Sequence, residues 1–134
     1  MSVDLHVHST ASDGAYSPEQ IIDLAVGKGL TAVAICDHDS MAANAAALAA
    51  AEGRIAYLPG VEVSSVRRGQ ELHILGYFAR ADYAPLLDEL RHVRVERAAR
   101  IERTVARLNE LGVELEVADV EAAAGAEEGH DIAL

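Results

Sequence analysis

Histidines and carboxylates with metal-ligand spacing lie at the start of the chain. Apolar and polar residues alternate over residues 3–8, which is typical of a strand with two different faces. His6 and His8 therefore project from the same face, with Asp4 one step behind, and two neutral imidazoles at this spacing can bind one metal ion. Asp13, in a Ser-Asp-Gly turn, adds a carboxylate at the same end. The alternative interpretation of His6-Val-His8 alone is a polar face on an edge strand.

Strands and helices are expected to alternate after this first strand. The spacing predicts a helix that begins at Pro18, with Ser17 as N-cap and Gln20 completing a capping box, and that ends near Gly27 or Gly29. We further expect a buried strand over 30–36, a helix over 41–52, a strand over 55–64 with a break at 59–60, a turn over 67–70 and a strand over 71–78. This order predicts a parallel α/β sheet or barrel.

Polar side chains recur where these predicted strands end. Asp37 and His38 follow the second strand, and Glu62 lies near the end of the third. Because chemistry in parallel α/β folds sits at the carboxyl ends of the strands, we expect these side chains to meet His6 and His8 at one rim. His73 falls in the middle of its predicted strand, so strand geometry alone places it less securely.

A long helix is predicted over 83–111, with a short helix over 119–124. Its arginines recur every third residue and then one turn later: Arg91, Arg94, Arg97, Arg100, Arg103 and Arg107. One interpretation is a solvated face with neighbouring acids. The other is that one or two of these arginines lean over the site and hold a phosphate.

Composition narrows the class of protein. The 134 residues are 51% hydrophobic, enough for one domain with a core of small aliphatic side chains, and the formal charge of −11 argues against general affinity for nucleic acids or anionic membranes. Cys36, the single cysteine, is expected in the core rather than as a nucleophile paired with His38. No signal peptide or long apolar run is recognisable, so a cytoplasmic protein is expected.

Four separated motifs resemble those of the PHP family, the polymerase and histidinol phosphatase type of metal-dependent phosphoesterase. They are Asp4-Leu-His-Val-His-Ser-Thr-Ala-Ser-Asp-Gly14, Ile35-Cys-Asp-His-Asp39, Pro59-Gly-Val-Glu-Val-Ser64 and His73-Ile-Leu-Gly-Tyr77. The resemblance covers essentially the whole chain and is strongest to small stand-alone nucleotide phosphatases and exonucleases. It implies a distorted, TIM-like (β/α)₇ barrel that holds up to three Mn²⁺, Zn²⁺, Mg²⁺ or Fe²⁺ ions.

The resemblance also implies roles for individual residues. His6 and His8 would bind one ion, Glu62 would bridge it to a second ion that His73 also binds, and Asp13 and His38 would belong to a third. Asp4 would be a supporting carboxylate that orients the histidines.

For the substrate phosphate, the resemblance suggests His130 together with Arg97 from the arginine-rich helix. Glu128 occupies the position where family members carry a phosphate-contacting arginine, so this sequence departs from the family pattern at that contact.

The chain is about half the length that such a barrel needs, since barrels of this type run to about 200 residues or more. We therefore expect residues 1–134 to form a single PHP domain truncated at its C-terminal end. An open strand edge and an exposed apolar face follow from this. Self-association or a second chain would then complete the barrel.

The function expected is hydrolysis of phosphate mono- or diesters by a metal-bridging hydroxide. A phosphorylated small molecule or a nucleic-acid end would be the substrate. One alternative is a truncated or degenerate fragment that binds metal but is inactive. Another is an RNA-binding module that uses the arginine-rich helix, whose salt-sensitive binding would survive chelation.

Overall fold

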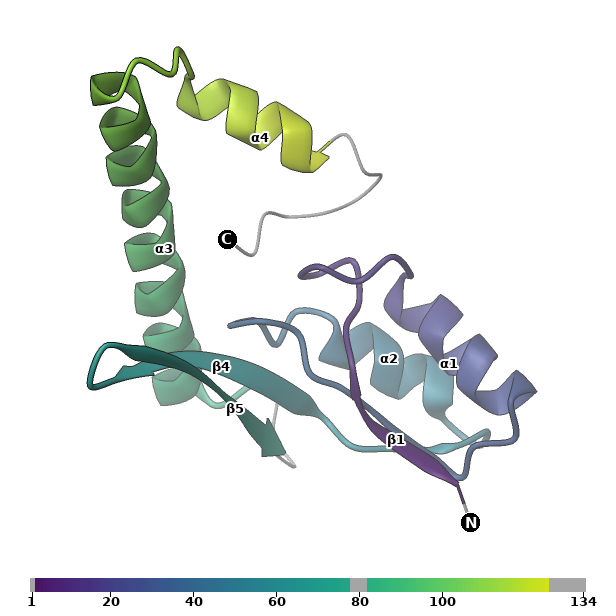
Figure 1. The fold of residues 1–134 in the computed structure, drawn as a ribbon. Coiled ribbons are helices and arrows are strands. Elements are labelled where there is room, and N and C mark those ends of the chain that lie inside the picture. Colours follow the sequence, from purple (N-terminus) through teal and green to yellow (C-terminus); the bar gives the residue numbers. More distant parts are fainter. Residues whose placement is uncertain (1, 78–81, 126–134) are drawn as a thin grey trace.

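A parallel sheet opens the fold in the computed structural model, which describes residues 2–77 and 82–125. The elements run β1 (Val3–Val7), α1 (Pro18–Gly27), β2 (Ala32–Ile35), α2 (Asn44–Ala51) and β3 (Ala56–Tyr57). The three strands pair in the order β1-β2-β3, all parallel. Figure 1 shows α1 and α2 side by side, and their buried side chains form one core with those of β2. The predicted β-α-β-α-β order is confirmed.

α1 begins as the sequence predicts. The Ser17 hydroxyl accepts a hydrogen bond from the Gln20 N–H at 3.3 Å, and the Gln20 side chain accepts one from the Ser17 N–H at 2.9 Å. This reciprocal capping box satisfies two N–H groups that a helix start leaves unpaired. The helix buries Ile21, Ile22 and Ala25 against the sheet.

α2 is shorter than the helix predicted over 41–52, since it begins only at Asn44, whose side chain makes a tertiary contact. Its side-chain amide donates to the carbonyl of Gly60 at 3.1 Å, and its side-chain oxygen accepts from the Gly60 N–H at 3.1 Å and from the Tyr57 hydroxyl at 2.7 Å. Asn44 is only 1% exposed. It thus attaches the start of α2 to the bend between β3 and β4.

β4 (Gly60–Arg67) and β5 (Gln70–Tyr77) form an antiparallel hairpin, which departs from the parallel pattern expected for the sheet. The reason is the turn: Arg68 and Gly69 both have positive φ, 54° and 78°, and a two-residue turn of this kind reverses the chain directly. A single parallel bridge between His38 and Glu62 links the hairpin to the sheet. The break predicted at 59–60 separates β3 from β4.

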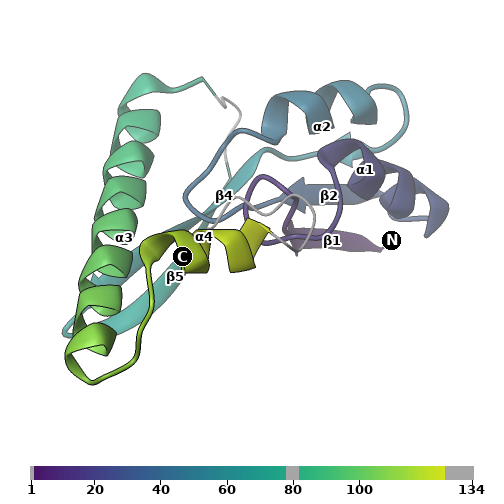
Figure 2. The same cartoon turned by 90° about the horizontal axis from the view of Figure 1, so that it is seen from above.

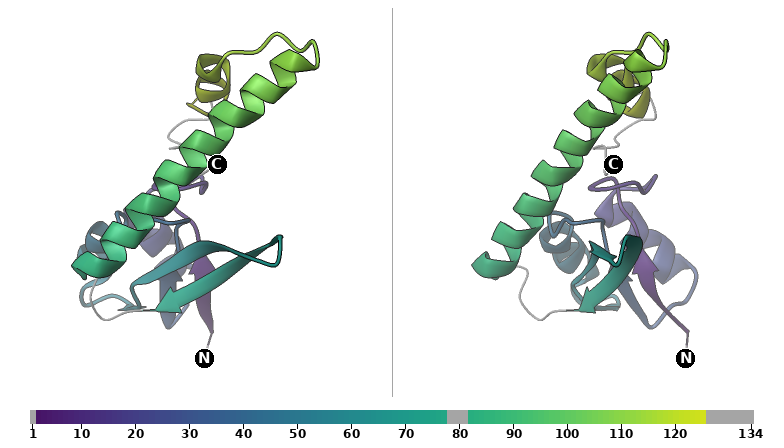
Figure 3. Two further views of the ribbon diagram at one scale, coloured as in Figure 1. Left: turned by 90° about the vertical axis from the view of Figure 1, so that its left-hand side faces the viewer. Right: turned by 60° about the vertical axis from the view of Figure 1, so that its left-hand side comes forward.

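α3 (Ala84–Glu110) is the long helix predicted from the arginine-rich segment, and α4 (Val117–Gly125) follows it. The N-terminal part of α3 packs through Leu90 on Val61 of β4 and on Met41. Figures 2 and 3 show the rest of α3 passing beside the hairpin and extending beyond the sheet.

β1 lies at an edge of the three-stranded sheet, where Val3 and Leu5 are 49% and 37% exposed. This agrees with the open strand edge that the sequence predicts. In the described part of the chain, no helix is long and apolar enough to cross a membrane.

Replacement of Asn44 by alanine should lower the free energy of unfolding by about 3 kcal/mol, because it leaves buried polar groups of Gly60 and Tyr57 unpaired. Urea denaturation followed by circular dichroism measures this. Asn109→Ala is the matched control: Asn109 also makes two backbone hydrogen bonds, to Leu115, but at an exposed position, so its loss should stay below about 1 kcal/mol. Equal losses for the two variants would contradict the role given to Asn44.

Candidate metal centre

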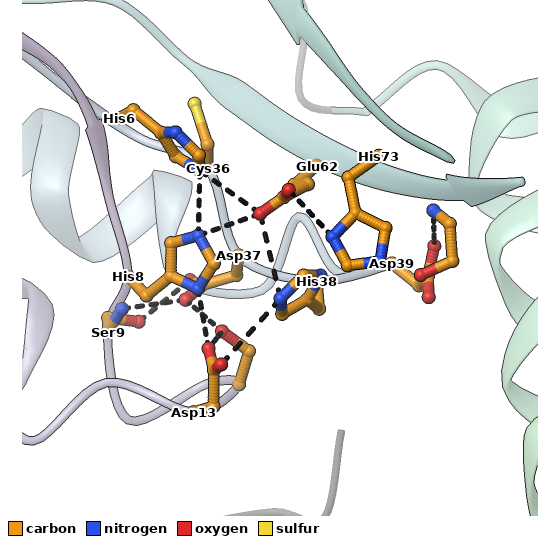
Figure 4. A network of polar contacts seen from close by, with 12 residues as sticks. His6, His8, Ser9, Asp13, Cys36, Asp37, His38, Asp39, Glu62 and His73 are labelled. Atoms are coloured by element: carbon orange, nitrogen blue, oxygen red, sulfur yellow. Dashed lines mark hydrogen bonds and ion pairs between the residues drawn. The ribbon is translucent and has the colours of Figure 1, made fainter. Parts of the chain in front are cut away.

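All six side chains that the resemblance suggests as metal ligands converge at one rim, and Figure 4 shows them around the carboxylate of Glu62. β1 and the loop after it supply three, the segment after β2 supplies one, and the hairpin supplies two. They form three overlapping groups in which the ligand-type atoms lie within 4.8 Å of one another: His6, His8 and Glu62; His8, Asp13 and His38; and His38, Glu62 and His73.

The first group is arranged around one carboxylate oxygen. The Nε2 atoms of His6 and His8 lie 3.1 and 2.9 Å from Oε2 of Glu62 and 3.0 Å from each other. The two histidines reach this point because residues two apart on a strand share a face. Two imidazole nitrogens and one carboxylate oxygen pointing inward are a donor set suited to Zn²⁺, Mn²⁺ or Fe²⁺.

Glu62 also faces the histidines of the third group, His38 and His73. Its Oε1 lies 3.0 Å from Nδ1 of His73, and its Oε2 lies 3.6 Å from Nε2 of His38. His73 reaches the rim because β5 runs antiparallel to β4, which the parallel strand pattern did not indicate. Nδ1 of His38 is buried and has no hydrogen-bond partner among the described residues.

Asp13 approaches the same rim from the loop over residues 9–14. Its carboxylate bonds to Nδ1 of His8 and lies 3.6 Å from Nε2 of His38. A carboxylate on the second nitrogen of a histidine fixes which tautomer the ring adopts and leaves the other nitrogen free to accept or bind. Asp13 therefore both belongs to a donor group and orients His8.

The loop is held in place by Asp37, which the sequence placed at the rim but which points away from it. This fully buried carboxylate accepts hydrogen bonds at 2.7 Å from the N–H and hydroxyl of Ser9 and from the hydroxyl of Ser12. Neighbouring residues at a strand end face opposite ways, so His38 enters the cluster while Asp37 anchors the loop. Gly14 fits here because a Cβ would lie 2.1 Å from the carbonyl oxygen of His8.

Asp39 is a buried residue that sequence reasoning did not assign. Its N–H donates to the carbonyl of Glu62 at 2.9 Å, and its Oδ1 accepts from the Ser64 N–H at 2.8 Å. Its Oδ2 accepts from Arg97 at 2.9 Å and its carbonyl accepts from Arg94 at 2.6 Å. The only sequence signal for this role of Asp39 is that the acidic motif Asp37-His38-Asp39 occurs together with a periodic row of arginines, which could pair with it.

The arginine row on α3 divides between the two interpretations of the sequence. Arg91 and Arg107 are exposed and pair with Asp88 and Glu110 of the same helix, as a solvated face would. Arg94 and Arg97 instead lean toward the cluster and hold Asp39. The role of Arg97 in holding a substrate phosphate stays a prediction.

The sequence also singles out Asp4, Cys36 and His130, and the donor groups of the described residues include neither Asp4 nor Cys36. Oδ1 of Asp4 accepts from the backbone N–H of His6 at 3.2 Å, so its contact is with the strand and its orienting role stays a prediction. His130 lies outside the described residues. Cys36 is buried, donates to the Leu5 carbonyl, and has its pKa raised to about 11 by burial and by the carboxylates of Glu62 and Asp37. This favours the core interpretation of Cys36.

Burial and the charges of the cluster together shift the pKa values of Glu62, Asp13 and His38. Burial alone would raise the pKa of Glu62 and of Asp13, but hydrogen bonds and positive potential from the histidines outweigh it, and both pKa values fall below the ordinary ones. Burial lowers the pKa of His38, against the partial compensation of Glu62 and Asp13. Ionised carboxylates and a neutral His38 are the forms that bind metal ions.

A β/α sheet with imidazoles and carboxylates clustered at its strand ends is typical of β/α proteins that bind metal ions. The particular family follows from comparison with known proteins. Residues 4–110 match the model of the PHP domain, and the chain belongs to this family.

Relatives with assigned functions support the same placement. The chain is 41% identical over 101 residues to the 3′,5′-nucleoside bisphosphate phosphatase of Chromobacterium violaceum, covering 72% of this chain and 35% of that protein. It is 45% identical over 74 residues to the 5′-3′ exoribonuclease of Haemophilus influenzae, covering 54% and 27%. The matched segments thus cover only about a third of the length of these relatives.

A solved structure confirms the likeness of the fold. A protein of Bifidobacterium adolescentis described as a metal-dependent phosphoesterase superposes with a TM-score of 0.80 at 28% identity. The match covers 98% of this chain and 46% of the other one.

Asp37→Ala should destabilise the protein by about 3 kcal/mol or more, since it removes three buried bonds to a charged acceptor. Urea denaturation measures the loss. Asp23→Ala is the control, because Asp23 is exposed and pairs with Arg54 on the surface, where such pairs contribute about 0–1 kcal/mol. A loss for Asp37→Ala as small as that of the control would contradict the anchoring role.

The metal-free protein should lose stability as the pH falls below about 6.5. The folded-state pKa of His38 is lower than its ordinary value of 6.5, so the unfolded chain binds the proton first and protonation favours unfolding. The lowered pKa values of Glu62 and Asp13 act in the same direction below about 4.5.

Urea unfolding in EDTA at a series of pH values measures this effect. The variant His38→Gln should show a smaller fall in stability between about pH 7.5 and 5.5. A fall of the same size in the variant would contradict the assignment to His38.

Proposed function

We propose that this chain carries the metal-binding part of a phosphoesterase that hydrolyses phosphate mono- or diesters. The observation that supports it most directly is the set of three overlapping donor groups, two of which share the buried carboxylate of Glu62. A carboxylate shared between groups suits neighbouring divalent ions, the arrangement used by two-metal phosphoryl-transfer sites. The functions of the relatives, a bisphosphate phosphatase and an exoribonuclease, support the same class.

The proposed ligands are those suggested by the family resemblance. His6, His8 and Glu62 hold one ion, Glu62 and His73 hold a second, and Asp13 and His38 belong to a third. The imidazole-rich sets favour Mn²⁺, Fe²⁺ or Zn²⁺ over Mg²⁺, which prefers oxygen ligands.

Bound divalent ions supply an activated water and neutralise the charge of the phosphate oxygens. The chain's own side chains prepare that site. Asp13 sets the tautomer of His8, so that Nε2 of His8 faces Glu62. Glu62 is almost completely buried, and this burial keeps water from hydrating its carboxylate. Asp37 and Asp39 hold the two loops that carry Asp13 and His38.

The chain is proposed to form the N-terminal part of a distorted (β/α)₇ barrel, with the arginine-rich α3 beside the site. Each donor group has three members, whereas a zinc-type ion takes about four ligands, so further ligands are expected from the remainder of the barrel. The exposed edge of β1 is where another strand would pair. That remainder would come from a second chain, from self-association or from further residues of the same protein.

Nucleotides and nucleic-acid ends are the substrates that the relatives favour. A fragment that binds metal but does not turn over is the second candidate, supported by the three-membered donor groups. Metal titration combined with an assay for phosphate release separates the two.

His6→Ala and His73→Ala should each lower the affinity for Mn²⁺ by more than about 100-fold at one site, since each removes a ligand of a different group. Calorimetric titration of the metal-free protein gives affinity and stoichiometry, and release of phosphate from a nucleoside 3′,5′-bisphosphate gives activity. His92→Ala is the matched control, an exposed histidine on α3 that should change neither.

Metal binding together with turnover supports the enzyme, and metal binding without turnover supports the inactive fragment. Absence of Mn²⁺ and Zn²⁺ binding at millimolar concentration would overturn both.

A further inference from the structure

A groove of about 300 Å³ runs between the hairpin and α3, outside the donor groups. Ser64, Ser65, Val66 and Glu71 line it from the hairpin, and Val93, Glu96, Arg97, Arg100 and Arg103 line it from the helix. Figures 2 and 3 show α3 passing beside β4 and β5.

The groove begins next to the metal centre. Ser64 is directly opposite His73 in the hairpin register, and Val66 is opposite Glu71. Cross-strand partners have Cβ atoms about 5 Å apart and share a face of the sheet. Since residues two apart also share a face, Glu62 and Ser64 lie side by side, and the surface that carries Glu62 and His73 continues directly into the groove.

The polar groups of the groove are suited to an anion. Arg100 and Arg103 form no ion pair with a described residue, in contrast to Arg91 and Arg107 on the same helix. The hydroxyl of Ser64 is buried and has no hydrogen-bond partner in the described part of the chain. Two guanidinium groups and an unused hydroxyl therefore face the groove beyond Arg97, which Asp39 holds in place.

The basic character of this groove is local. The chain has a net charge of −11, and Glu71 and Glu96 also line the groove, so a polyanion is attracted only where the arginines cluster. Arg67 at the end of β4 and Arg68 in the turn follow Val66, although neither lines the groove. A row of positive charges leading away from a phosphoesterase centre matches a chain of phosphates rather than a single one.

We propose that this groove binds the phosphodiester backbone of a single-stranded nucleic acid whose terminal phosphate lies at the metal centre. The inference rests on the proposed function and specifies its substrate as a nucleic-acid end. Arg100 and Arg103 contact consecutive backbone phosphates, Ser64 donates its hydroxyl to the phosphate nearest the centre, and Arg97 is a positioning residue held by Asp39.

The test compares the double variant Arg100→Ala/Arg103→Ala with the control Arg91→Ala/Arg107→Ala, which removes the same charge from the same helix outside the groove. Binding of a fluorescent, 5′-phosphorylated oligouridylate to the full chain is followed by anisotropy in EDTA, between about 50 and 200 mM salt. Circular dichroism verifies that each variant is folded.

The groove variant should bind the oligonucleotide roughly tenfold more weakly, and its slope of log affinity against log salt should fall by about 1.4, since each single-strand phosphate contact contributes about 0.7. The control should retain the wild-type affinity and slope. Glu96→Gln should bind more tightly than wild type, because it removes a negative charge from the groove.

Three outcomes would overturn the inference. They are an unchanged slope in the groove variant, an equal change in the control, and an equal loss of affinity for a nucleoside 3′,5′-bisphosphate, which would indicate a site for one further phosphate only. Because binding is measured without metal, groove-dependent binding by a chain that never hydrolyses phosphoesters supports the groove and counts against the enzyme. Hydrolysis without groove dependence does the reverse.

Discussion

The buried carboxylate of Glu62 is the constraint on which the rest of the site depends. It is 5% exposed, and a carboxylate removed from water is costly unless positive or hydrogen-bonding groups surround it. Here histidines from β1, from the segment after β2 and from β5 provide that surrounding, with His6, His8 and His73 at 2.9–3.1 Å. Each of these segments is therefore held at the rim by the same charge, and a divalent ion there would compensate it further.

Two further aspartates keep the loops at the rim in register with Glu62. Asp37 closes the loop that carries Asp13, and Asp39 ties the segment after β2 to Ser64 on β4 and to Arg97 on α3. Both are fully buried, and the carboxylate of each accepts hydrogen bonds from other residues of the protein. The candidate ligands thus face the rim, whereas Asp37 and Asp39, the neighbours of His38 in the sequence, hold the surrounding segments in place.

Family membership and an incomplete sheet are compatible in this chain. The described part of the chain contains the donor groups and the helix beside them, while β1 leaves exposed Val3 and Leu5 at an edge of the sheet. Each donor group in the described part of the chain has three members, and we propose that further ligands come from the rest of a barrel.

Much of the fold and of the candidate site could be predicted from the sequence, because the signals are local. The capping box at Ser17, the apolar strand before Asp37 and the arginine-rich helix depend on neighbouring residues, and the motifs around His6, Glu62 and His73 identified the candidate ligands. Their roles as ligands remain predictions.

Contacts between distant segments could not be predicted in this way. The reversal at Arg68-Gly69 brings His73 beside Glu62, strand alternation turns Asp37 away from the rim, and Asp39 meets Arg97 across 58 residues of sequence. The sequence by itself thus determined which side chains are candidate metal ligands and which segments carry them. Only the tertiary structure decided how they meet, because that depends on packing and charge compensation between elements that no local pattern records.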